Sequence, residues 1–96
     1  RFFEEMERLA PLGEGNPEPL FAAYRIEPDR VLPAGKRHSR GILRDENGAK
    51  MDFIAFNTPP NELPGTPWDI AYAPQINRFR GRSTPQLRLV DLRHSQ

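Results

Sequence analysis

Few residues able to perform catalysis occur in this chain, and they lie far apart in the sequence. The two histidines are His38 and His94, and neither has a carboxylate or a second histidine at the spacing of a metal site. Ser39, Ser83 and Ser95 lack the sharp glycine-flanked turn that presents a hydrolase nucleophile. The absence of cysteine excludes thiolate metal sites and disulfides. We therefore predict no catalytic residue and no metal ligand in this chain.

The glycine-rich stretch GEGNPEP, residues 13–19, is similar to a phosphate-binding loop only in its glycines. No lysine followed by serine or threonine ends it, and no strand is expected before it. Pro17 and Pro19 also remove backbone N–H donors that a phosphate cradle needs. We interpret residues 11–19 as a proline-glycine connector that turns the chain.

Basic side chains on one face of the segment HSRGILRD, residues 38–45, indicate a surface for a polyanion. In a strand, alternate side chains point the same way, so the cations here share a face with an apolar residue, Ile42. Single-stranded nucleic acid suits such a face, because cations neutralise phosphates while bases rest on flat or apolar groups. The candidate contacts are Lys36, Arg37, His38, Arg40 and Arg44.

The segment NRFRGR, residues 77–82, has the same composition of arginines around one aromatic residue. Its amide and guanidinium groups suit base edges, sugars and phosphates. A structural interpretation is also open, in which Phe79 packs into the end of a barrel and the arginines lie in solvent. The candidate contacts here are Asn77, Arg78, Phe79, Arg80, Arg82 and Gln86.

The charge distribution agrees with a local polyanion-binding surface. The formal net charge is only +1, but residues 75–96 carry five arginines against one aspartate, whereas residues 1–32 carry seven acidic residues against four arginines. The chain starts at Arg1 rather than methionine and has 96 residues, so we expect a piece of a longer protein with one domain. It contains no apolar run that could span a bilayer and no signal peptide, and we expect no membrane association and a cytoplasmic location.

Local patterns predict one helix followed by five short strands. Residues 1–10 are expected to form an amphipathic connecting helix, and residues 20–96 a nucleic-acid-binding domain. Strands are predicted at 20–26 with extension to about 32, and at 38–45, 49–57, 67–74 and 85–93, with a tight turn at Asn47-Gly48. The proline-rich residues 58–66 should be neither a central strand nor a helix. The predicted core residues are Phe53, Ile54, Phe56, Trp68, Ile70, Tyr72, Leu87, Leu89 and Val90.

Five strands without βαβ spacing predict an all-β, five-stranded antiparallel Greek-key barrel of the OB type. An SH3-like barrel is the alternative, since strand counting does not separate the two.

Three segments in this order, LAPLGEGNPEPLF, KRHSRGILRDENGAKMDFIAFN and INRFRGRSTPQLRLVDLR, make the chain resemble the C-terminal OB domain of the RecJ family of single-strand-specific DNA exonucleases. By position, the resemblance implies that His38, Arg40 and residues 77–81 contact single-stranded DNA. Ser39 and Gly41 depart from the family, which usually places aliphatic residues at these inward positions. We therefore expect this strand to be bulged or loosely packed.

The resemblance implies that the full-length protein is a hydrolase acting from the 5′ end in DNA repair and recombination. Its divalent metal, Mn or Mg, would lie in catalytic domains absent from this chain, which itself would need no cofactor. Expected partners are single-stranded DNA, those catalytic domains and single-strand-binding protein. Two alternatives remain: a structural or protein-interaction barrel that braces the catalytic domains without touching nucleic acid, and a barrel that binds RNA.

Overall fold

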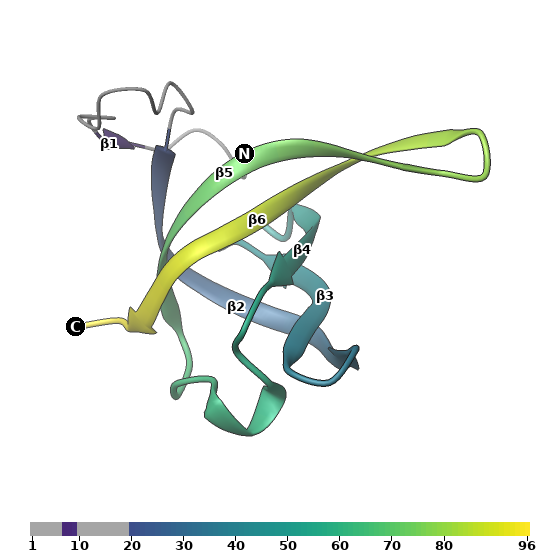
Figure 1. The fold of residues 1–96 in the computed structure, drawn as a ribbon. Helices are drawn as coiled ribbons and strands as arrows, with labels where there is room; N and C mark the ends of the chain where they lie inside the picture. The colour runs from purple at the N-terminus through teal and green to yellow at the C-terminus, as the bar shows by residue number, and fades with distance from the viewer. Residues whose placement is uncertain (1–6, 10–19) are drawn as a thin grey trace, which may run out of the picture.

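Six strands and one short 3-10 helix make up the described part of the chain (Figure 1). The structure is a computed structural model and describes residues 7–9 and 20–96. The elements are β1 (Glu7–Leu9), β2 (Leu20–Ala34), β3 (His38–Arg44), β4 (Lys50–Ala55), η1 (Pro60–Glu62), β5 (Trp68–Phe79) and β6 (Arg82–His94).

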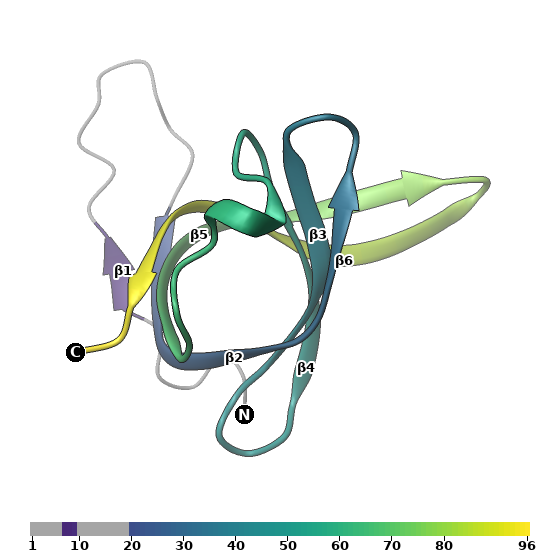
Figure 2. The same cartoon turned by 90° about the horizontal axis from the view of Figure 1, so that it is seen from below.

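Strands β2 to β6 form a closed five-stranded barrel. The sheet order is β1-β2-β3-β4-β6-β5, and pairing of β2 with β5 closes the ring that Figure 2 shows. Strands β4 and β6 are parallel, and all other pairs are antiparallel. The prediction of five strands in an all-β barrel is thus confirmed, but the purely antiparallel pairing is wrong. Strands β4 and β6 are not consecutive in the chain, so no local pattern reveals their direction.

The long strand β2 serves two sides of the barrel because it bends twice. Its first half pairs with β5 and its second half with β3, and the register shifts between Ala23 and Ile26 and again between Pro28 and Arg30. Each shift is a bulge, which increases local twist and bends a strand. Arg25, inside the first bulge, has a left-handed backbone with φ 56°. These bends let one strand turn the corner of the barrel.

The predicted linker at residues 75–84 is instead an arm formed by the ends of β5 and β6. These strands pair as far as Phe79 and Arg82, and Figure 1 shows the arm extending well beyond the barrel. Arg80 and Gly81 form the two-residue turn with φ values of 53° and 77°, as a type I′ hairpin requires. Pro74 and Pro85 hid the strands, since proline is unusual inside a strand and the predicted strands therefore end and begin at these two residues.

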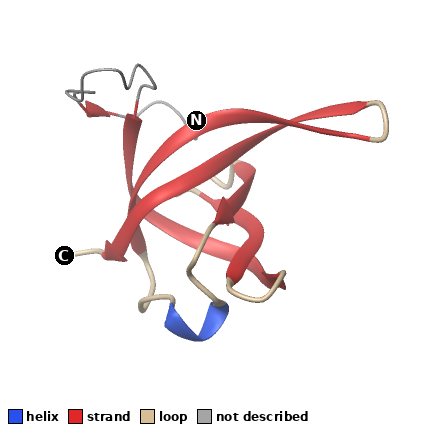
Figure 3. Ribbon diagram, in the orientation of Figure 1, coloured by secondary structure: helices blue, strands red, loops and turns tan. Residues whose placement is uncertain are grey.

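Two helix predictions need correction. Of the helix expected over residues 1–10, Glu7–Leu9 is a strand paired with β2, so the prediction is wrong there. The other residues of that helix, and residues 11–19 of the connector, lie outside the described part. The proline-rich segment, expected to be free of helix, contains the single turn η1 (Figure 3). Proline is favoured in a first helical turn because its missing N–H would have no partner there. Leu63, next to η1, packs against the core and helps to cover one end of the barrel.

The barrel interior is filled by apolar side chains from all five strands. Six predicted core residues are buried: Phe53, Trp68, Ile70, Tyr72, Leu87 and Leu89. Phe56 and Val90 are wrong, with 48% and 46% of their surface exposed, and Ile54 is only partly buried. Phe56 lies beyond the end of β4, and Val90 is the extra residue in a bulge of β6 opposite Ala71 and Tyr72. Bulges and strand ends change which face a side chain occupies.

Strand β3 is regular, contrary to the expected bulge, and its small inward residues have specific reasons. A Cβ at Gly41 would overlap the backbone carbonyl of Arg30, so the bulge in β2 occupies the space that a side chain would need. Ser39 is fully buried, and its Oγ donates a hydrogen bond to the Thr58 carbonyl at 2.6 Å. The inward face of β3 is therefore confirmed, and the distortion belongs to its neighbour.

Candidate nucleic-acid interface

The outer faces of β3, β4 and β6 carry a row of cationic and apolar side chains in register. Arg40 pairs with Ile54, and Ile54 pairs with Arg88, so the three side chains lie side by side across three strands. Paired residues of adjacent strands project to the same face. Ile42, Asp52 and Gln86 form the next row. We call this surface, from His38 and Phe56 at one end to Ile42 and Gln86 at the other, the outer face.

His38 and Phe56 form the aromatic end of the outer face. Their rings meet edge to face, with centroids 5.2 Å apart and planes at 78°. The Nδ1 of His38 accepts a hydrogen bond from the backbone N–H of Asn57 at 2.8 Å. In the neutral ring the hydrogen is therefore on Nε2, which points away from this bond. His38 acts here as a support for Phe56 and the chain that follows it.

Two of the predicted cations, Arg37 and Arg44, are already paired with acidic residues. Arg44 Nε lies 3.3 Å from Asp29 Oδ1, and Lys50 Nζ lies 3.1 Å from Asp29 Oδ2. Hydrogen bonds from Lys50 and Arg44 hold the pKa of the Asp29 carboxyl below its usual range. Arg37, in the β2–β3 turn, lies 3.7 Å from Glu62 of η1.

Lys36 and Arg40 differ from Arg37 and Arg44 in their ion pairing. Both are exposed, and no ion pair among residues 20–96 involves either of them. An unneutralised guanidinium keeps its full charge for a phosphate, whereas a paired one must first give up its carboxylate. The predicted basic face therefore divides into paired cations and cations available to a ligand.

The arm continues the outer face. Along β5 and β6 the pairs Gln75–Gln86, Asn77–Thr84 and Phe79–Arg82 alternate with pairs that face the other way. Because Gln86 belongs to the outer face, Asn77, Phe79 and Arg82 project to the same side. Gln75 Nε2 donates to Gln86 Oε1 at 2.9 Å. Arg78 pairs with Ser83 and projects to the opposite side, so the predicted cluster at 77–82 is split between two faces.

Phe79 is at the tip of the arm with 65% of its surface exposed. The guanidinium carbon of Arg80 lies 5.1 Å from the centroid of its ring, at the distance of a cation–π contact. The structural interpretation, with Phe79 packed into the barrel end, is therefore wrong.

A hollow of about 240 Å³ joins the sheet to the arm. Its lining is Ile42, Lys50, Met51, Asp52, Thr84 and Pro85, from β4, the end of β3 and the base of the arm. The β2–β3 turn adjoins the outer face at its His38 end, whereas the arm leaves it at the Gln86 end. The predicted residues of the two segments therefore lie at opposite ends of the outer face, and Arg78 projects away from it.

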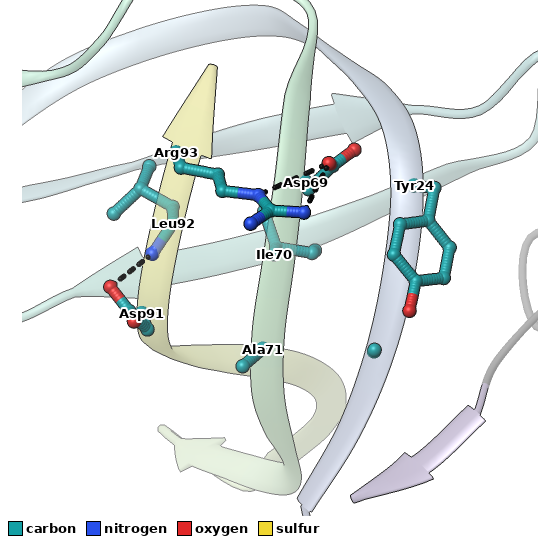
Figure 4. A pocket seen from close by; sticks show the side chains of 8 residues that line it. Tyr24, Asp69, Ile70, Ala71, Asp91, Leu92 and Arg93 are labelled. Carbon is teal, nitrogen blue, oxygen red and sulfur yellow. Dashed lines mark hydrogen bonds and ion pairs between the residues drawn. The ribbon is translucent and has the colours of Figure 1, made fainter. Parts of the chain in front are cut away.

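A second hollow, of about 260 Å³, lies on the wall formed by β2, β5 and β6 (Figure 4). Its central carboxylate, Asp69, accepts hydrogen bonds from Ser95 Oγ at 2.7 Å, from the Arg25 backbone N–H at 3.2 Å and from Arg93. Burial acts to raise the pKa of Asp69, but these hydrogen bonds outweigh it and hold the pKa below the usual value. Asp69 therefore fastens the C-terminal strand to β5.

Residues 7–9 and 20–96 provide no cluster of three or more histidine or acidic side chains that could bind a metal ion. The donor set needed for a divalent metal is thus not present in this described part. This described part also contains no helix with the length and apolarity that crossing a bilayer requires.

Besides Asp52, the sequence-based prediction missed three residues of the outer face: Ile54, Phe56 and Arg88. The first two were assigned to the core, and Arg88 was not selected. For Ile54 and Arg88 a local signal exists, because each lies between two buried neighbours of its strand and must point outward. Their alignment with Arg40 depends on the pairing of β4 with β6, which no local signal shows.

Comparison with known proteins identifies similar sequences. Residues 1–91 match the family described as RecJ OB domain. The chain is 33% identical over 93 residues to the single-stranded-DNA-specific exonuclease RecJ of Haemophilus influenzae, covering 92% of this chain and 16% of that protein. It is 30% identical over 94 residues to the enzyme of the same name from Dickeya dadantii, covering 93% and 16%. The chain thus spans about a sixth of the length of these relatives. No solved structure matches.

Proposed function

Since the chain belongs to the RecJ OB-domain family, we propose that its outer face binds single-stranded DNA for a RecJ-like exonuclease that acts from the 5′ end. The bacterial relatives are single-stranded-DNA-specific exonucleases by name, and this chain corresponds to a small part of their length. In five-stranded OB barrels, the face of the second and third strands and the two loops beside it commonly bind oligonucleotides. Here these elements are β3, β4, the β2–β3 turn and the arm.

The observation that carries the proposal is the row Arg40–Ile54–Arg88 beside Phe56. The backbone positions of Arg40 and Arg88 lie two strand spacings apart, roughly 10 Å, with the apolar side chain of Ile54 between them. This spacing lets the arginines contact phosphates while a base rests on Ile54 or stacks on Phe56. Neither contact reads base identity, so the face binds with little sequence preference.

The arm and the β2–β3 turn add cations at the borders of this face. Lys36 in the turn and Arg82 on the arm neutralise further phosphates, and Phe79 offers a second stacking surface. Asn77 and Gln86 provide hydrogen bonds to sugars or base edges. A flat aromatic contact requires an unstacked base, so duplex DNA is a poorer ligand.

In the full-length protein, this domain holds the strand while separate catalytic domains cleave it. The divalent ion that such an exonuclease uses, Mn or Mg, would be bound in those domains. They are the first partner proposed here, with single-strand-binding protein as a second and the cytoplasm as the location.

Binding is tested by titrating labelled single-stranded DNA into the chain at several salt concentrations. RNA of the same sequence and duplex DNA serve as comparison ligands. We expect single-stranded DNA to bind best, with an affinity that falls steeply as salt rises. The double variant Arg40→Gln/Arg88→Gln should bind more weakly, whereas Arg25→Gln on the β2–β5 wall should not. Equal binding of both variants would favour a structural barrel, and preference for RNA would reassign the ligand.

A further inference from the structure

The arm has a second face, which the proposed DNA contact does not use. The pairs Pro74–Leu87, Ile76–Pro85 and Arg78–Ser83 project to the side opposite Phe79 and Arg82. We call the exposed residues Pro74, Ile76 and Pro85 the apolar arm face. Of the surface of Ile76, 54% is exposed. These three side chains are neighbours and form one exposed apolar patch, and such patches mark interaction sites.

The apolar arm face extends the barrel interior outward. Leu87, fully inside the core, is the pair of Pro74, and Met51 packs partly against the same core. A hollow of about 180 Å³ lies between them, lined mainly by Met51, Pro74, Ile76, Pro85 and Leu87. This apolar stripe therefore runs from the core onto the arm, where residues 20–96 leave more than half of the Ile76 surface exposed.

The two prolines exclude one mode of binding to the arm, the addition of a partner strand at its edges. In a two-residue hairpin, Phe79 and Arg82 exchange hydrogen bonds, so the alternate pairs Ile76–Pro85 and Pro74–Leu87 direct their backbone nitrogens away from each other. Pro74 and Pro85 thus remove an N–H from each outer edge of the arm. Proline at an edge blocks the addition of another strand. A partner must therefore contact the side chains of the face and not the edges.

The size of the apolar arm face identifies the kind of partner. Three side chains and one small hollow supply far less than the roughly 800 Å² per partner that a stable separate complex buries. A surface linked through the same polypeptide needs less contact, because its effective concentration is high. The relatives contain about five sixths of their length outside the matched region, which provides such a linked surface.

We propose that the apolar arm face docks against another domain of the same exonuclease polypeptide. The inference rests on the proposed function in one respect, since it takes the chain to be part of such an enzyme. The surface of the partner domain should be apolar, with an acidic group beside it that faces Arg78. Arg78 projects from the same side of the arm as the apolar arm face. One side of the arm then contacts the DNA strand, and the other fixes the arm to the rest of the enzyme.

Hydrogen exchange of residues 74–87 in the full-length exonuclease, without DNA, tests the docking. The variant is Ile76→Ser, and the matched control is Val90→Ser, which removes a similarly exposed aliphatic side chain from β6 outside the arm. We expect exchange at the amides of residues 77, 79 and 84, which bond across the arm and open only when the arm frays, to become about tenfold faster in Ile76→Ser only. Pro85→Ser, a second change on the same face, should act in the same direction.

Unchanged exchange in both arm variants would overturn the proposal. Protection that disappears on dilution would also overturn it, because the partner would then be a second copy. The DNA-binding proposal fails separately: it requires Arg40→Gln/Arg88→Gln to weaken DNA binding, and that variant should leave arm exchange unchanged. A protected arm without DNA binding would leave the docking proposal standing and overturn the DNA-binding proposal. DNA binding with an unprotected arm would do the reverse.

Discussion

The imidazole Nδ1 of His38 accepts the backbone N–H of Asn57 at 2.8 Å, which joins the start of β3 to the residue after Phe56. Asn57 has a left-handed backbone with φ 59°, so this bond holds a turn that costs energy to form. The same imidazole meets the Phe56 ring. A side chain selected as a DNA contact thus also positions the aromatic residue beside it.

Replacing His38 separates these two roles. His38→Ala leaves the Asn57 N–H without its acceptor and should lower stability by about 1 kcal/mol. It should also weaken binding of single-stranded DNA, because Phe56 loses its support. His38→Asn offers a side-chain oxygen near the position of Nδ1 and should restore most of both properties. Thermal unfolding and DNA titration measure them, and no rescue by asparagine would disprove the positioning role.

Arg40 and Arg44 should contribute differently to DNA binding, although both project from the outer side of β3. Arg40→Gln removes an exposed cation and should reduce the slope of log affinity against log salt by about 0.7, the value for one phosphate contact with a single strand. Arg44→Gln should change the slope much less, because Asp29 already neutralises Arg44. DNA titrations at four salt concentrations give both slopes. A larger effect at Arg44 would place the strand across the Asp29 side of the barrel.

Gly41 should tolerate no side chain. Gly41→Ala forces the Arg30 carbonyl to move and should destabilise the fold by about 3 kcal/mol. Gly48→Ala is the control, since φ there is 84° but no atom lies within 4 Å of the added Cβ. Only backbone strain of about 1 kcal/mol is expected from it. Denaturant unfolding of the two variants compares them, and equal losses would argue against the close contact between β2 and β3.

The Asp69 carboxylate should make stability depend on pH. Its pKa in the folded chain is lowered, so its contribution is complete above the unfolded value of about 3.9 and is lost as pH falls through the folded value. Asp69→Asn should therefore cost about 2 kcal/mol at neutral pH. The difference from the original chain should shrink below about pH 4. Unfolding measured from acid to neutral pH checks this, and a constant difference would contradict it.

The barrel class, the family, most of the core and the basic character of the binding candidates follow from local sequence patterns. Alternation along single strands is a local property, and it placed Ser39 and Leu43 inward and Arg40 outward as the structure has them. The turn at Asn47-Gly48 is equally local: Asp45 Oδ1 accepts hydrogen bonds from the N–H groups of Asn47 and Ala49, each at 2.9 Å.

Which of these residues lie together depends on how distant strands pair. The parallel pairing of β4 with β6 aligns Ile54 with Arg88, and the pairing of β3 with β4 adds Arg40. The arm likewise became visible only through its pairing, which divides Arg78 from Phe79 and Arg82. The physical reason is that strand order and ion pairing depend on segments far apart in the chain. A local pattern states which way a side chain points within its strand, but not which side chain lies next to it.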